Sequence, residues 1–392
     1  MKSNMNKFLS IFLYVAGIIC LFLYSYTQVD LSLTLSRISI WQTIEKSFQY
    51  IGYFQRPLST YLYVGILISL LASYVGLLML IRNNVLSRKT VWILVIATAV
   101  ILTFSYNAFS YDLFNYIFDA KIVTHYFQNP YMHKALDFPH DPMLSFMHWT
   151  QRIYPYGPIW LFITIPISFV GMQFFLPTFF LFKALASISY LGIAWSVEKI
   201  LKKTDPQNSL FGIAVFAFSP LVIIEGLVSA HNDMVMVLFI SLALVTFMNK
   251  KSVWSFLLLF LSIGIKFATA VLLPLWIIGT FIKKKGEMES LALVSFILLI
   301  IPLVVASLRT NFQPWYILFL FPFASLMPKQ KEILVGFTLF SFTALFQYIP
   351  FLYIGNWDNP IPFILLLMLW SSVGLSIVVS VCMWVLRVAK RR

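Results

Sequence analysis

Residues 208–248 read NSLFGIAVFAFSPLVIIEGLVSAHNDMVMVLFISLALVTFM, and this stretch decides the fold class. Two apolar runs, at 208–224 and 232–248, are each close to the length that an α-helix needs to cross a bilayer. The polar residues where the runs meet are Glu225, His231, Asn232 and Asp233. Because ionisable groups are costly within a membrane, the stretch predicts two spans with a polar cluster at one membrane surface.

Similar apolar runs recur along the whole chain. Its residues are 60% hydrophobic and only 11% charged, with a mean hydropathy of +0.87. A soluble domain is about half apolar and a quarter charged. The sequence therefore predicts an all-α polytopic membrane protein of about 11–13 spans, with residues 1–392 as one integral membrane domain. The further runs are 8–26, 58–81, 91–107, 175–197, 252–265, 268–282, 289–307, 314–327, 333–352 and 361–386.

The net charge of +14 comes from short basic clusters between these runs, not from one basic surface. Such clusters are typical of cytoplasmic loops, so nucleic-acid binding is rejected. They are Arg82/Arg88/Lys89, Lys199/Lys202/Lys203, Lys250/Lys251, Lys283–Lys285, Lys329/Lys331 and Arg387/Lys390/Arg391/Arg392. With these inside, the predicted outer loops are 107–153, 225–231, 265–267, 308–313 and 353–360. Most acids and all the histidines then face the extracytoplasmic side of a plasma (inner) membrane.

Three smaller features fit this organisation. Cys20 and Cys382 lie in opposite terminal runs, which gives neither a disulfide framework nor a metal spacing. The run at 8–26 is long and lacks a small-residue cleavage site, so we interpret it as an anchor helix. The proline-interrupted segment 157–172 is interpreted as a short re-entrant or interfacial piece, which keeps the topology consistent.

The predicted outer loop 107–153 is too aromatic to be disordered. A helical pattern covers 111–127, with Ser110 as a candidate N-cap. Pro130 disfavours helix at the residue before it, so the helix should end near Asn129. The loop should therefore present an ordered helix to the outer compartment and form part of any active site there.

One face of this helix carries Asp112, Asn115 and Asp119, since residues four and seven apart lie on the same side. Its apolar side chains would rest on the membrane surface, as in an interfacial amphipathic helix. They are Leu113, Phe114 and Ile117. From the pattern alone, solvated surface acids remain as good an interpretation as catalytic ones.

Five motifs now stand in order along the chain. They are SYDLFNYIFDAKIVTHYFQNPY (110–131), HDPM (140–143), YPYGPIWLF (154–162), EGLVSAHNDMVMVLF (225–239) and IGIKFATAVLLPLW (263–276). Together they resemble the multi-span GT-C glycosyltransferases that use polyprenyl-phosphate sugars, especially the bacterial α-(1→6)-mannopyranosyltransferases. The resemblance implies inverting transfer of a hexose, expected to be mannose, to a glycolipid or polysaccharide acceptor at the extracytoplasmic face.

The resemblance also implies roles for individual residues. Asp112 matches the outer-loop aspartate taken as the general base, while Asp119 is a second acid that leaves the base assignment open. The other matched positions are Tyr116, Pro130, Tyr131, Tyr156, Gly157, Pro158, His231, Asn232, Asp233 and Lys266. We therefore expect Asp112, Asp119 and His231 to be catalytic. The expected substrate-binding residues are Tyr116, Tyr131, Tyr156, Asn232, Asp233, Lys266 and Arg309.

The chemistry supports these expectations. Transfer from a phosphate needs a carboxylate to take the acceptor's proton and donors that stabilise the departing phosphate. A carboxylate at the start of a helix, such as Asp112, is favoured by the helix dipole, and the span start at His231 would favour an anion. Lys266 interrupts an apolar run and either meets the phosphate or snorkels to the interface.

Three assignments stay open at this stage. Arg309 is a candidate second phosphate cation, and Glu225 would pair with Lys266 or Arg309. Lys183, within a predicted span, has no assigned role. The outer-loop histidines show no paired ligand spacing, so no metal and no cofactor is expected; the lipid-linked sugar is a substrate.

Competing functions must be weighed against this one. A transporter or flippase of a lipid-linked saccharide would place polar groups near the midplane, often in repeated halves, and no repeat is visible. A polysaccharide polymerase or ligase is expected to depend on outer-loop arginines, whereas acids and histidines dominate here. A membrane scaffold would not need clustered acids. The expected partners are the bilayer, the lipid-linked donor and a glycan acceptor.

Overall fold

The computed structural model describes residues 2–172, 174–281 and 287–390. Within these ranges the chain forms helices, loops and one isolated bridge between Lys134 and Ile153. The expected all-α architecture is confirmed. The basic residues at 283–285 and 391–392, predicted to mark cytoplasmic loops, lie outside the described residues.

Six helical segments of the described chain are long and apolar enough to cross a membrane, which makes this a multi-pass membrane protein. They are Met5–Gln28, Arg56–Arg82, Phe175–Thr204, Glu289–Thr310, Lys331–Ile354 and Ile361–Ala389. The pair Pro206–Ala217 and Val222–Val228, bent by 61°, would be a seventh. Fewer segments reach spanning length than the roughly 11–13 expected, because other apolar helices contain only 10–17 residues.

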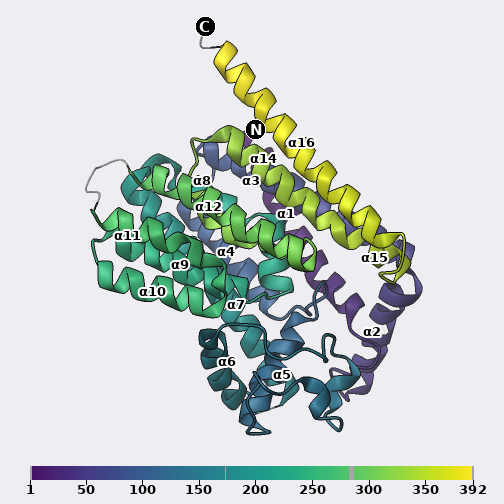
Figure 1. The fold of residues 1–392 in the computed structure, drawn as a ribbon. Coiled ribbons are helices and arrows are strands. Elements are labelled where there is room, and N and C mark those ends of the chain that lie inside the picture. Colours follow the sequence, from purple (N-terminus) through teal and green to yellow (C-terminus); the bar gives the residue numbers. More distant parts are fainter. Residues whose placement is uncertain (1, 173, 282–286, 391–392) are drawn as a thin grey trace.

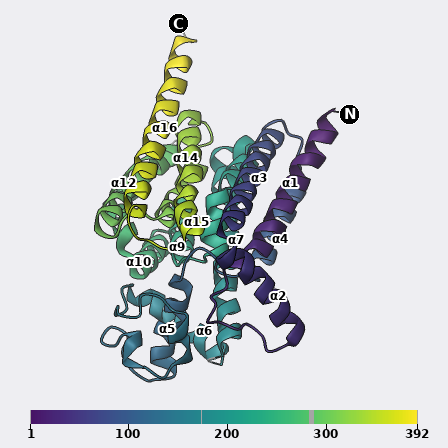
Figure 2. The same ribbon diagram turned by 90° about the vertical axis from the view of Figure 1, so that its right-hand side faces the viewer.

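The helices are arranged in two parts. The long helices are α1 (Lys2–Ser25), α3 (Arg56–Arg82), α7 (Phe175–Thr204), α12 (Glu287–Thr310) and α16 (Ile361–Ala389), and α14 (Lys331–Ala344) is the first part of the longer segment Lys331–Ile354. Helix α1 packs along α3, and α14 packs along α16. Shorter helices α4 (Arg88–Thr103), α8 (Ser209–Ala217), α9 (Asp233–Met248), α10 (Ser252–Ile265), α11 (Leu273–Phe281), α13 (Phe321–Ser325) and α15 (Ile349–Ile354) pack among them. Helices α2 (Ser39–Gln49), α5 (Asp112–Thr124) and α6 (Pro158–Val170) form a layer at the end away from both termini (Figures 1 and 2).

The stretch 208–248 folds differently from two straight spans. After α8 the chain bends near Pro220, which cannot donate a backbone hydrogen bond, and enters the π-helix η6 (Val222–Val228). Helix α9 then begins at Asp233. Residues 212–237 are all buried, so this stretch forms the centre of the molecule and its polar cluster lies inside the protein.

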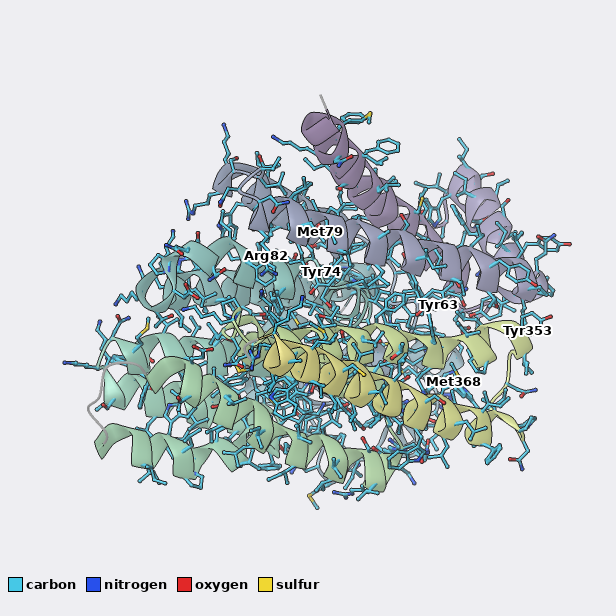
Figure 3. The ribbon with its side chains drawn as sticks, turned by 90° about the horizontal axis from the view of Figure 1, so that it is seen from above. Tyr63, Tyr74, Met79, Arg82, Tyr353 and Met368 are labelled. Atoms are coloured by element: carbon cyan, nitrogen blue, oxygen red, sulfur yellow. The ribbon has the colours of Figure 1, made fainter. Side chains whose placement is uncertain are left out.

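Buried tyrosines tie α3 to this centre. The Tyr74 hydroxyl donates to the carbonyl oxygen of Val215 in α8 (3.2 Å), and the Tyr63 hydroxyl donates to that of Leu345 (2.9 Å). Both side chains lie on the side of α3 that faces the C-terminal helices (Figure 3). The long N-terminal helices therefore pack directly against the buried stretch.

Helix α5 confirms the predicted helix near 111–127. The N-cap is Tyr111 rather than the predicted Ser110, although the Ser110 hydroxyl accepts from the backbone N–H of Asp112 (3.2 Å). The prediction that the apolar side of this helix rests on the membrane surface is wrong. The apolar residues predicted to rest on lipid are 0–3% exposed because they pack against protein; they are Leu113, Phe114 and Ile117. Residues 157–172 form one 13-residue helix, α6, capped by Gly157 with Pro158 at its first position.

Candidate active site

A chain of polar contacts crosses the buried centre. The Oδ2 atom of Asp112 lies 3.5 Å from Nδ1 of His231, and Nε2 of His231 lies 3.3 Å from Oε2 of Glu225. The Tyr348 hydroxyl donates to Oε1 of Glu225 (2.7 Å). The expected pairing of Glu225 with Lys266 or Arg309 is therefore wrong, because the π-helix directs this carboxylate toward His231 and Tyr348.

Exposure distinguishes the two acids beside the imidazole. The Glu225 and His231 side chains are 0% exposed, whereas that of Asp112 is 18% exposed. Of these two carboxylates, Asp112 is therefore the one that is open to solvent. It is also the first residue of α5, where the helix dipole favours a negative charge.

His231 is held as a cation between these acids. Burial lowers the pKa of the imidazole, but the neighbouring carboxylates of Asp112 and Glu225 outweigh burial and raise the pKa to about 9. The ring also stacks on Trp315, with centroids 4.2 Å apart and planes 20° apart, an arrangement that favours a cationic ring. No motif singles out Trp315, which follows the predicted outer loop 308–313.

Backbone strain lies immediately before His231. Ala230 has a φ of 53°, in the left-handed region that side chains other than glycine seldom adopt. Such a conformation costs on the order of 1 kcal/mol and persists only where the surroundings enforce it. The strained turn brings the chain from η6 into α9 and places His231 between the two acids.

A second ion pair lies at the start of α9. The Lys266 ammonium donates to both carboxylate oxygens of Asp233, at 2.9 and 2.8 Å. Asp233 is 0% exposed and Lys266 26% exposed, so the lysine reaches outward from a buried partner. The structure thus brings Lys266 beside the His231–Asp233 segment, as the sequence predicted for the two outer turns.

Aromatic residues lie beside Asn232, the remaining polar residue of the cluster. The Tyr116 hydroxyl donates to Oδ1 of Asn232 (3.3 Å), and the Tyr116 ring packs edge-on against Tyr156 and Trp160. The amide nitrogen of Asn232 is buried and has no hydrogen-bond acceptor among the described residues. It is therefore an unsatisfied hydrogen-bond donor inside the protein.

The Tyr-Gly-Pro turn at residues 156–158 connects the motif 154–162 to the motif 263–276. The backbone N–H of Gly157 donates to the carbonyl oxygen of Ile265 (3.0 Å), immediately before Lys266. The Tyr131 hydroxyl donates to the carbonyl oxygen of Tyr156 (3.1 Å). The turn thus fixes the outer loop and Lys266 relative to each other.

Replacing Gly157 with Ala should destabilise the protein, because the new Cβ would lie 2.1 Å from the carbonyl oxygen of Gly264. Overpacking of this kind costs about 1–3 kcal/mol. We expect a lower apparent Tm in detergent. Gly65→Ala is the matched control, since a Cβ at Gly65 meets nothing within 4 Å. Equal Tm values for the two variants would contradict this account of the turn.

Two predicted site residues lie apart from the cluster. Asp119 is half-buried on α5, and burial, with a further contribution from Asp112, raises the pKa of its carboxyl to about 8. Arg309 is exposed at the end of α12 and makes no hydrogen bond or ion pair with the described cluster. Within the described ranges, no three His, Cys, Asp or Glu side chains are close enough to hold a metal ion.

Comparison with known proteins identifies a family. Residues 14–281 match the family described as alpha-(1->6)-mannopyranosyltransferase, N-terminal domain. The chain is also similar to alpha-(1->6)-mannopyranosyltransferase A of Corynebacterium glutamicum, with 25% identity over 210 residues. That alignment covers 52% of this chain and 42% of the relative's length. No solved structure matches the chain. Because the family match covers most of the sequence, the chain belongs to the α-(1→6)-mannopyranosyltransferase family.

Proposed function

We propose that this protein transfers a mannosyl group from a polyprenyl-phosphate mannose donor to a glycolipid or polysaccharide acceptor, with inversion, at the extracytoplasmic face. The observation that carries the proposal is the pair of Asp112 and His231. A partly exposed carboxylate at a helix start faces a buried imidazolium at 3.5 Å. The family match and the membrane-spanning helices support the sugar and the lipid-linked donor.

The reaction requires one proton acceptor and one anion-binding group. Asp112 takes the proton from an acceptor hydroxyl while the oxygen of that hydroxyl bonds to the anomeric carbon of the donor. The bond from that carbon to the phosphate oxygen breaks, and polyprenyl phosphate leaves with the electron pair. The Lys266 ammonium, whose side chain is 26% exposed, is the donor placed to stabilise the developing phosphate charge.

The neighbouring groups prepare Asp112 for this role. The buried His231 ring faces the Asp112 carboxylate at 3.5 Å, and Glu225 contacts the other side of the ring at 3.3 Å, so Asp112 has a fixed partner. Asp119 suits the role less well, since a carboxyl with a pKa near 8 is mostly protonated at neutral pH. Asp112 is therefore the proposed general base.

Proteoliposomes containing the purified protein provide the direct test. Labelled polyprenyl-phosphate mannose and an oligomannoside acceptor should yield a labelled oligosaccharide, and NMR of the new anomeric centre should show the configuration opposite to that of the donor. Retention of configuration would exclude the inverting mechanism. Movement of labelled lipid between leaflets without any transfer would instead indicate a flippase.

Transfer should not require a divalent metal. The charges at the site are supplied by Lys266 and His231, and the described residues provide no metal-ligand cluster. We expect the initial rate in excess EDTA to stay within about twofold of the rate without chelator, because ammonium and imidazolium groups can stabilise the leaving phosphate. A rate that falls in EDTA and recovers with added Mg²⁺ or Mn²⁺ would contradict this expectation.

A further inference from the structure

Lys183 is a fully buried lysine within the long helix α7. Buried lysines normally pair with a carboxylate or face a cavity. Here the Nζ atom instead donates to the carbonyl oxygens of Leu227 and Val228, the latter at 2.7 Å, and to the Ser105 hydroxyl oxygen at 2.9 Å. The described contacts of this amine are thus all with backbone and hydroxyl oxygens.

The two carbonyls lie where η6 ends. The last carbonyls of a helix lack intrahelical partners and carry the negative end of its dipole. At this end the chain turns sharply through Ala230, with its φ of 53°, so the carbonyls cannot be satisfied by continuing the helix. The Lys183 amine on α7 donates hydrogen bonds to them instead. It therefore fixes the end of the segment that carries Glu225 and leads directly to His231.

The third contact reaches the other half of the site. Ser105 follows the end of α4 and begins the connection that enters α5 at Asp112. The same amine thus holds the segment before Asp112 and the segment between Glu225 and His231. These segments are far apart in sequence, and their side chains must meet for the 3.5 Å contact of Asp112 with His231 to form.

We propose that Lys183 is a positioning residue for sugar transfer, which holds the end of η6 against the connection to α5 so that His231 and Glu225 stay aligned with Asp112. The inference rests on the proposed function. It assigns a role to the lysine that the sequence places within a span and leaves without one. Misplacement of a catalytic group by about 1 Å can cost 100-fold in rate, so loss of this contact should be visible in catalysis.

Lys183→Met is the variant that tests the proposal, because methionine keeps much of the side-chain length and removes the donor. We expect kcat to fall about 100-fold, with the donor KM changed less than about threefold. The basic limb of the pH–rate profile should move to lower pH, because the Asp112 carboxylate helps to raise the pKa of His231, and an imidazole that has lost this neighbour gives up its proton more readily. A loss that is merely structural would lower the active fraction and leave both the donor KM and the pH profile unchanged.

Tyr190→Phe is the matched control. Tyr190 is also fully buried on α7, and its hydroxyl donates to a backbone carbonyl, that of Ala217 (2.9 Å), away from the polar cluster. We expect kcat within about threefold of wild type and an unshifted pH profile. If Lys183→Met does not fold, Ser105→Ala removes one of the three contacts and should give a smaller kcat loss with a shift in the same direction.

Hydrogen–deuterium exchange separates this proposal from the proposed function. Amides of residues 229–233 should exchange faster in Lys183→Met than in wild type, and should be unchanged in Tyr190→Phe. Wild-type exchange together with a wild-type kcat and pH profile in Lys183→Met would overturn the positioning role. A wild-type protein that transfers no sugar would overturn the proposed function. The exchange data would still show whether the contacts of Lys183 hold residues 229–233 in place.

Discussion

Asp112→Asn should lower the rate of sugar transfer at least about 1000-fold while the protein remains folded. Asparagine matches aspartate in size and keeps a hydrogen-bonding side chain, but its amide cannot accept the proton of an attacking hydroxyl. General-base catalysis contributes about 100- to 10,000-fold, and the amide also loses the charge that faces His231 at 3.5 Å. Initial rates with saturating donor and acceptor in proteoliposomes measure the loss directly.

The matched control for this variant is Asp119→Asn on the same helix. The Asp119 carboxyl has a pKa near 8 and is mostly protonated at neutral pH, so an amide resembles its prevailing form. We expect a rate within about threefold of wild type. Wild-type activity in Asp112→Asn would remove Asp112 from the mechanism. A large loss confined to Asp119→Asn would transfer the role of base to Asp119.

Much of the site was predictable because its parts are local in sequence. A helix-compatible run that ends before Pro130 predicted α5 and the position of Asp112 at its start. The predicted loops 225–231 and 265–267 placed His231 and Lys266 at the same face, and the Asp233–Lys266 ion pair agrees with this placement. Such conclusions need only helical geometry and hydropathy.

The partners of Glu225 and the role of Lys183 could not be predicted in the same way. A π-helix changes the direction of every side chain after it, and apolar sequence does not reveal where one forms. As a result, Glu225 points to His231 and Tyr348, which lie far from each other in sequence. Lys183 donates hydrogen bonds to backbone carbonyl oxygens. Every residue has such a carbonyl, so the sequence does not show which residues are its partners.

The apolar face of α5 illustrates a different limit. Hydropathy reports that Leu113, Phe114 and Ile117 avoid water, and this is correct. It does not distinguish lipid from protein as their surroundings, because both are apolar. In this protein the layer around α5 is closed by aromatic side chains from the outer loop and α7, including Phe146 and Phe179. Of the polar residues on this helix, Asp112 contacts the buried cluster.

His231→Gln should lower kcat about 100-fold, the second-largest effect expected at the site. Glutamine keeps hydrogen-bonding ability but carries no positive charge, so it leaves Asp112 and the fully buried Glu225 uncompensated. Removing one partner of a buried charge pair costs several kcal/mol, and Asp112 then loses the charged ring that faces it at 3.5 Å. Because Asp112 acts in the chemical step, kcat should fall more than donor affinity.

The same variant should also change how stability depends on pH. The pKa of His231 is about 9 in the folded protein and 6.5 in a solvated chain. Because the folded-state pKa is raised, the imidazolium stabilises the fold fully below pH 6.5, and this contribution is lost as pH rises through about 9. Its upper limit is about 3 kcal/mol, from 1.36 kcal/mol for each pKa unit. The apparent Tm of wild type should therefore fall between pH 7 and 10 by more than that of His231→Gln.

His140→Gln provides the control, since His140 is an exposed histidine of the outer loop. Its variant should keep the wild-type rate and the wild-type pH dependence of Tm. If His231→Gln and wild type lose stability in parallel between pH 7 and 10, His231 is not an imidazolium in the folded protein.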